Sequence, residues 1–485
     1  MVLAFVLYFS LLTILGFIGF KKIKTTDDYI LGSRSNGTFA GALSAEASDM
    51  SAWLFMGLPG SIYLAGTGQA WIAVGLFLGT VCNWVFIAKR LRQKSINSDN
   101  SVTLPEFFAK SMQNTSNKER ILLRFIPALA ILLFFTIYTA SGFVAGGNFF
   151  SSILHTSYTT SLIITAAVIL IYTFFGGFLA ISWTSVVQGT LMLISVISVP
   201  ITAFLVLGGV NAFFGPNPIT ENNPLFINNS SPVDIISALS WGLGYFGMPH
   251  ILIKYMSIKS QKTVKKSGIV AITWCFLSLF FAVIIGIIGR YYITGLNSNN
   301  SENVFIDMIN KLFVAGDAVH FPFLAGLFFC AILSAIMSTA ASQLLMSSSS
   351  ASVDIYRDII KRHNKGKTGD INETNNDKKI LWISRATVCI VAILAFIISI
   401  FPGNSIMSLV SDAWAGFGGT FGPAVLFILF WEKTKPKAII AGMLIGALTI
   451  LIWPLLPFVS ILYSLLPAFI LGSLTIYLFS VAIKY

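Results

Sequence analysis

The stretch that decides the fold is EASDMSAWLFMGLPG, residues 46–60, which lies within a long apolar segment. It places two carboxylates, Glu46 and Asp49, and two hydroxyls at a depth where a bilayer would have lipid tails. An ionisable side chain at that depth costs about 2.5–3.5 kcal/mol on insertion scales. The stretch ends in Gly57–Gly60, GLPG, which a regular helix tolerates poorly. A polar, broken membrane helix is typical of an ion or solute site in a transporter.

The composition of the chain is that of a membrane protein. Of its 485 residues, 55% are hydrophobic and only 10% are charged, whereas soluble proteins have about 25% charged residues. Many apolar runs exceed 18 residues, which predicts an all-α polytopic membrane protein. The cysteines lie in apolar runs without paired spacing, so we interpret them as small packing residues, neither disulfides nor metal ligands. They are Cys82, Cys275, Cys330 and Cys389.

The apolar runs predict 13 transmembrane helices in a single transporter domain, residues 1–485. The expected spans are 2–20, 37–63, 67–89, 124–150, 159–180, 184–209, 234–256, 267–294, 320–348, 380–401, 405–431, 437–456 and 459–483. An odd number of spans places the two termini on opposite sides of the membrane.

The basic residues indicate which side is which. All of the 31 lysines and arginines except Arg290 and Lys311 fall at one face of the predicted topology. Their segments are 21–36, 89–124, 254–266, 357–385, 433–437 and the C-terminus. Because cytoplasmic loops carry the excess of positive charge, we expect the N-terminus outside and the C-terminus in the cytoplasm. This placement accounts for the net charge of +12, so no nucleic acid partner is expected.

A second break is expected at WGLGYFGMPH, residues 241–250, which opens the seventh span as the first break opens the second. Spans 2–6 and 7–11 form two sets of five, which run through the membrane in opposite directions because five is odd. Breaks at corresponding positions of two inverted repeats, 37–209 and 234–431, indicate a substrate site near the bilayer midplane. Segment 437–483 adds two C-terminal helices. The alternative is that the glycines only allow close helix packing.

The ninth span carries a candidate cation site. Ala335, Ser338 and Thr339 stand at i, i+3 and i+4, so they share one helical face. A hard cation such as Na⁺ prefers oxygen ligands, and two hydroxyls with a backbone carbonyl supply three. The alternative is that the hydroxyls only bond back to carbonyls of their own helix.

Four motifs carry a family resemblance. They are SAEASDMS (44–51), YTFFGGFLAISWT (172–184), WGLGYFGMPH (241–250) and AWAGFG (413–418). Together they resemble the sodium/solute symporter family, and within it the proline carriers of bacteria. The resemblance implies a LeuT-like inverted-repeat fold, alternating access and Na⁺ as the coupling ion.

The resemblance also implies site residues. Its sodium ligands match the backbone carbonyls of Ala47, Met50 and Ala335 and the hydroxyls of Ser338 and Thr339. Its substrate-binding residues match Ser51, Tyr138, Trp241, Tyr245 and Pro249. The family's coupling aspartate matches Asp49, near the ion path without being a ligand. Arg34 matches a family arginine, although a charge at a helix end explains it equally well.

The chain departs from the proline carriers at five positions. These are Glu46, Ala52, Ser185, Met248 and Asp412, where the family has other residue types. Relatives with a second sodium use a carboxylate at the position of Ser185, so the serine favours a single sodium. Three departures lie near the expected substrate path, which leaves open another small amino acid or a carboxylate such as pantothenate.

The expected function is therefore sodium-coupled import of L-proline across a bacterial inner membrane, with no obligate protein partner. A channel would need a continuous polar ring instead of two occluded breaks. A sensor would carry an appended signalling domain, which we do not expect in a chain ending at Tyr485. An enzyme is not expected, because the sequence has neither HExxH nor G-x-S-x-G.

Overall fold

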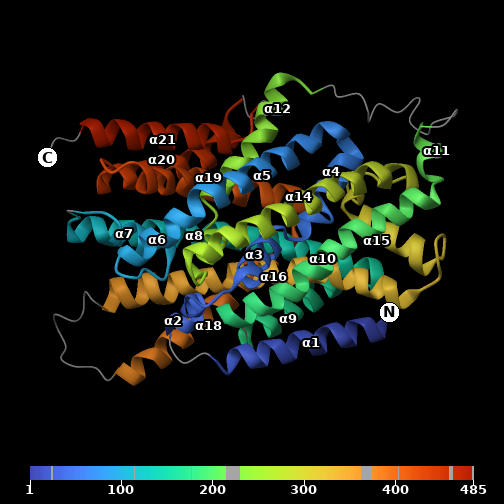
Figure 1. Ribbon diagram of the computed structural model, residues 1–485, viewed down its shortest axis with the longest axis horizontal. Coiled ribbons are helices and arrows are strands. Elements are labelled where there is room, and N and C mark those ends of the chain that lie inside the picture. Colours follow the sequence, from blue (N-terminus) through green and yellow to red (C-terminus); the bar gives the residue numbers. More distant parts are fainter. Residues whose placement is uncertain are drawn as a thin grey trace.

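The computed structural model describes residues 1–22, 26–113, 115–175, 177–214, 230–361, 373–401, 403–457 and 462–482, and nearly all of its regular structure is helical. The helices are α1 (Val2–Phe20), α2 (Thr26–Leu31), α3 (Thr38–Asp49), α4 (Gly57–Ala65), α5 (Ala70–Cys82), α6 (Ala88–Asn97), α7 (Leu104–Lys110), α8 (Asn117–Leu154), α9 (Tyr158–Phe175), α10 (Phe178–Val206), α11 (Gly209–Phe214), α12 (Pro232–Leu239), α13 (Pro249–Ser257), α14 (Gln261–Tyr292), α15 (Val304–Ile309), α16 (Pro322–Ser349), α18 (Glu373–Ile400), α19 (Ile406–Phe430), α20 (Pro436–Ile452) and α21 (Leu465–Ala482). The long helices run side by side along one direction, and α1 begins and α21 ends at opposite ends of the bundle (Figure 1).

Within the described residues, ten helices are long and apolar enough to cross a membrane. The count is eleven if the bent pair Pro232–Phe246 and Pro249–Ser257 forms one span. This confirms the prediction of an all-α polytopic membrane protein. The two remaining predicted spans, 37–63 and 159–180, coincide with the shorter apolar helices Ala52–Ala65 and Tyr158–Thr173. The exact number of 13 spans therefore stays a prediction.

The first break lies at the end of α3, whereas the Gly57–Gly60 stretch that was expected to interrupt the helix forms the first turn of α4. The last helical hydrogen bond of α3 runs from the Met50 N–H to the Glu46 carbonyl, 2.9 Å away. Ser51 then adopts a φ of 22°, a conformation that costs a non-glycine residue about 1–3 kcal/mol. The Ser51 hydroxyl accepts a bond from the Trp53 N–H at 3.1 Å and caps a short 3₁₀ turn before α4. The carbonyls that follow Glu46 at the end of α3 thus lie beyond the regular helical ladder.

The second predicted break is a 3₁₀ segment, Ser240–Phe246, between α12 and α13. Its chain is bent by 44°, and Pro249 begins α13, where the missing N–H of proline costs nothing. The segment also packs tightly against α5, since a Cβ at Gly242 would come within 2.2 Å of the Gly75 carbonyl oxygen. Its glycines thus serve the break and close helix packing together.

Helix α16 is largely buried and packs against α3, the helix that ends at the first break. Of its apolar window, 83% of the residues are buried, against 22% for α1. Helix α3 packs against α10, α13, α14 and α16. The broken end of α3 is therefore enclosed by helices, where polar groups can be satisfied by protein instead of by lipid.

Candidate functional site

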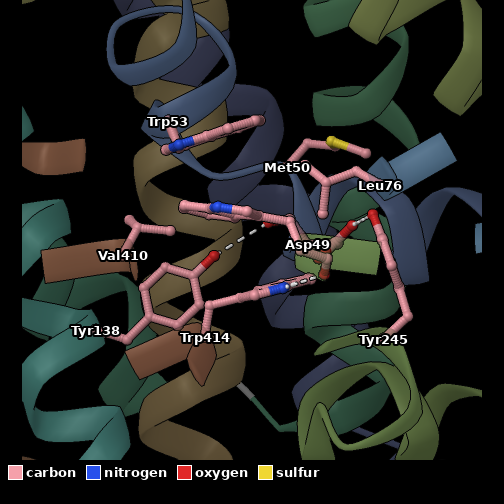
Figure 2. A pocket seen from close by; sticks show the side chains of 9 residues that line it. Asp49, Met50, Trp53, Leu76, Tyr138, Tyr245, Val410 and Trp414 are labelled. Atoms are coloured by element: carbon pink, nitrogen blue, oxygen red, sulfur yellow. Dashed lines mark hydrogen bonds between the residues drawn. The ribbon is translucent and has the colours of Figure 1, made fainter. Parts of the chain in front are cut away.

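A small cavity lies where the two breaks meet (Figure 2). It is lined by Asp49, Met50, Trp53, Leu76, Tyr138, Trp241, Tyr245, Val410 and Trp414. Its volume of about 10 Å³ leaves room for about one water molecule. A solute of the size of an amino acid therefore enters only when the aromatic walls separate.

Asp49 is the charged group at the cavity. Its side chain is buried, and the Tyr245 hydroxyl donates to its Oδ2 at 2.5 Å. The Tyr138 hydroxyl donates to the Asp49 backbone carbonyl at 3.3 Å, and Figure 2 shows both hydroxyls turned toward Asp49. Among the described residues, its Oδ1 has no hydrogen-bond partner and the carboxylate has no ion-pair partner. A buried carboxylate without a cation favours the approach of one.

Beside this carboxylate, α3 and α16 bring oxygen atoms together. The Ser338 hydroxyl donates to the Ala47 carbonyl at 2.6 Å and lies 3.4 Å from the Ala335 carbonyl. The adjacent Thr339 hydroxyl is buried and finds no hydrogen-bond partner in the described part of the chain. A buried hydroxyl without a protein partner keeps its lone pairs free to ligate an ion. The donor types suit a hard cation such as Na⁺.

Ser338 also donates to the Ser334 carbonyl at 2.7 Å. This is the bond to its own helix that was the alternative to ion binding. That alternative does not extend to Thr339. The hydroxyls of Ser342 and Ser347 on the same helix also have no partner among the described residues.

Aromatic rings form the remaining walls. The Trp414 indole N–H donates to the Trp241 carbonyl at 2.7 Å, and its ring meets Tyr245 edge-on at a centroid distance of 5.1 Å. Trp53 stacks on Trp241 at 5.9 Å with an interplanar angle of 28°. These contacts tie α19 and both breaks into one wall of mostly apolar surface.

Five of the residues singled out from the sequence line the cavity: Asp49, Met50, Tyr138, Trp241 and Tyr245. Ser51 lies beside them, but its hydroxyl caps the 3₁₀ turn. Pro249 starts α13 and is outside the lining, and the oxygens of Ala47, Ala335 and Ser338 form the neighbouring cluster.

Sequence reasoning assigned no role to Trp53, Leu76, Val410 and Trp414. Trp53 lies in the stretch 46–60, close to the first break, and Trp414 lies in the motif AWAGFG, but neither position by itself indicates a partner on another helix. Leu76 and Val410 are apolar residues of apolar helices, and nothing in the sequence distinguishes them from lipid-facing or core positions.

The residues that depart from the family pattern lie in different environments in the structure. Glu46 is buried, and its Oε1 accepts a bond from the Trp84 indole N–H at 3.0 Å. The Ser185 hydroxyl donates to the Ile181 carbonyl of its own helix at 2.6 Å, while Asp412 is exposed.

Arg34 donates to the backbone carbonyls of Met256 and Ser101 at 2.7 and 2.8 Å. The arginine thus joins segments that are far apart in the sequence.

The family model described as "Sodium:solute symporter family" matches residues 29–446, which include both breaks and α16. The chain belongs to the sodium:solute symporter family. It is 40% identical to the sodium/proline symporter of Escherichia coli (strain K12), covering 99% of this chain and 92% of the relative. It is 39% identical to a high-affinity proline transporter of Bacillus subtilis (strain 168), covering 96% and 95%.

Solved structures agree with this family at the level of the fold. A Na⁺-coupled sialic acid symporter in a substrate-bound outward-open state has a TM-score of 0.77 and 18% identity, covering 99% of this chain and 98% of that one. The nucleobase-cation-symport-1 transporter Mhp1 in a closed conformation has a TM-score of 0.54 and 14% identity. These likenesses show a LeuT-like fold, and membership of the symporter family makes the protein a multi-pass membrane transporter and not an enzyme.

Proposed function

We propose that this protein imports L-proline together with Na⁺ by alternating access. The observation that carries the proposal is the aromatic cavity beside Asp49, which adjoins the oxygen cluster between α3 and α16. The full-length similarity to sodium/proline symporters supports the choice of substrate. Coupling follows if Na⁺ orders the broken end of α3 against α16, because each solute then raises the affinity for the other by the same factor.

The proposed architecture has 13 spans in one domain, residues 1–485. The first inverted repeat is 37–209, the second is 234–431, and 437–483 adds two helices. The break between α3 and α4 and the bent pair Pro232–Phe246 and Pro249–Ser257 support it, because each stands first in its repeat. The basic segments support an N-terminus outside and a C-terminus in the cytoplasm of a bacterial inner membrane.

The proposed sodium site comprises the carbonyls of Ala47, Met50 and Ala335 with the hydroxyls of Ser338 and Thr339. The contact of Ser338 with the Ala47 carbonyl and the unpartnered hydroxyl of Thr339 support this set. Asp49 is the proposed coupling residue, since an unpaired carboxylate attracts the cation toward the site. Bonding of the Ser185 hydroxyl within its own helix is consistent with a single sodium.

The proposed substrate-binding residues are Ser51, Tyr138, Trp241, Tyr245 and Pro249. Tyrosine and tryptophan walls suit a small apolar ring, and a broken helix end offers N–H groups to a carboxylate. A solute whose charged groups found no partner in this buried site would lose about 1–3 kcal/mol per group.

The proposed function is tested with purified protein in proteoliposomes. We expect an inward Na⁺ gradient to drive uptake of labelled proline, and an equal K⁺ gradient to drive none. Excess unlabelled proline and close ring analogues should compete, whereas pantothenate, sugars and branched amino acids should not. Competition by pantothenate equal to that by proline would refute the substrate assignment while leaving sodium symport intact.

Loss of one hydroxyl from the proposed sodium site should weaken Na⁺ binding selectively. We expect Thr339→Ala and Ser338→Ala to raise the half-saturating Na⁺ concentration for uptake about tenfold, the effect of losing one buried polar partner. Ser349→Ala is the matched control, since that buried hydroxyl on α16 already donates to the Leu345 carbonyl at 2.8 Å. If saturating Na⁺ rescues neither variant, the two hydroxyls are structural.

A further inference from the structure

Tyr463 reaches the substrate cavity from outside both proposed repeats. It lies in the connection between α20 and α21, yet its ring stacks on Trp241 at a centroid distance of 5.0 Å and an angle of 18°. Trp241 in turn stacks on Trp53, at 5.9 Å and 28°. Tyr463 therefore belongs to a series of three rings, two of which line the cavity.

Several bonds fix Tyr463 and its neighbour. The Tyr463 hydroxyl donates to the Ser411 carbonyl of α19 at 2.6 Å. The Tyr463 backbone N–H donates to the Ser237 hydroxyl of α12 at 2.7 Å. The preceding carbonyl, of Leu462, accepts a bond from the Trp453 indole N–H at 2.9 Å. The ring is thus held at a set place against Trp241 instead of lying loosely over it.

These contacts join the two sides of the closed cavity. Ser237 and Trp241 belong to the bent pair that begins at α12, whereas Ser411 belongs to α19, which contributes Val410 and Trp414 to the lining. A cavity of about 10 Å³ must widen before a solute enters. In inverted-repeat transporters this happens when one body of helices moves against the other. A residue bonded to both α12 and α19 resists that separation.

We propose that Tyr463 is a positioning residue, which holds Trp241 in place as a wall of the substrate site. The proposal rests on the proposed function for the identity of the solute. Tyr463 touches Trp241, so it acts through the tryptophan and not on the substrate itself. Its loss frees Trp241 from the position in which it forms a wall of the substrate site, and the apparent affinity for substrate falls in proportion to the population that keeps this position.

The kinetic test compares three variants in proteoliposomes. Tyr463→Leu removes the ring, and we expect the proline KM to rise about threefold to tenfold, the range that an aromatic pair contributes, with little change in Vmax. Tyr463→Phe keeps the ring and should restore most of the affinity. Tyr477→Leu is the matched control, because Tyr477 of α21 also stacks on a tryptophan, Trp431, at 5.4 Å and 22°. An unchanged KM in Tyr463→Leu, or an equal rise in Tyr477→Leu, would overturn the proposal.

A second test measures closure without any solute. Val410→Cys places a thiol at the cavity, and a membrane-impermeant maleimide is applied to vesicles of both orientations. In the Tyr463→Leu background we expect labelling about threefold to tenfold faster than with Tyr463 present. Equal rates would refute the role of Tyr463. Because no proline is used, this result stands even where the wild type transports another solute, so failures of the two proposals are distinguishable.

Discussion

Replacing Asp49 with asparagine is expected to reduce sodium-driven uptake about 100-fold, while the protein still inserts into the membrane. The substitution keeps the shape of the side chain, and the Tyr245 hydroxyl, now 2.5 Å from Oδ2, can still donate to an amide oxygen. The substitution removes the buried negative charge. A hydrogen bond to a charged group contributes about 1.5–3 kcal/mol. The loss should appear in Na⁺ dependence, measured as uptake against Na⁺ concentration.

Ser48→Ala is the control for this variant. Its hydroxyl is buried next to Asp49 but already donates to the Ser44 carbonyl at 2.7 Å within α3. We expect this variant to keep the wild-type Na⁺ dependence. Immunoblotting of the membrane fraction separates lost transport from lost insertion. Wild-type half-saturating Na⁺ in Asp49→Asn would show that the carboxylate has no part in coupling.

The two breaks could be predicted because they depend on local chemistry. Pro249 begins α13, as a proline at the second break predicts. The first break falls at Ser51, ahead of the Gly57–Gly60 stretch that suggested it, and that stretch lies inside α4. The grouping of Asp49 with Tyr245, nearly 200 positions away, was predicted only through the family resemblance. No periodicity within one helix specifies which helices face each other across the bundle.

The contributions of Trp53, Trp414 and Tyr463 could not be predicted for the same reason. Each acts through a ring partner on another element, and aromatic residues are common in membrane helices for reasons of lipid contact and packing. Tyr463 is the clearest case, because its segment lies after the second proposed repeat. Only the three-dimensional arrangement brings it against Trp241.

Adding one methyl group at Gly244 is expected to disable the substrate site. A Cβ there would lie 2.0 Å from the Trp414 Nε1, and two further atoms of the same indole would be within 2.6 Å. The indole cannot yield easily, because it is buried and its N–H is bonded to the Trp241 carbonyl at 2.7 Å. Either Trp414 leaves the wall or the 3₁₀ segment moves away from α19, and both outcomes displace Trp241 and Tyr245. We expect Gly244→Ala to lower proline uptake at subsaturating concentration about 100-fold, as displacements near 1 Å in such sites can do.

Gly142→Ala provides the comparison for Gly244→Ala. Its Cβ would meet only the Ile336 Cγ2, at 4.0 Å, so it adds the same methyl group without a clash. Alanine also favours a helix over glycine by about 1 kcal/mol, so uptake and thermal stability should be preserved. The double variant Gly244→Ala with Trp414→Ala separates folding from binding. Removing the indole should relieve the clash and restore the melting temperature, but not the affinity, because the wall is then missing. Wild-type KM in Gly244→Ala would mean that the contact between the second break and α19 does not shape the substrate site.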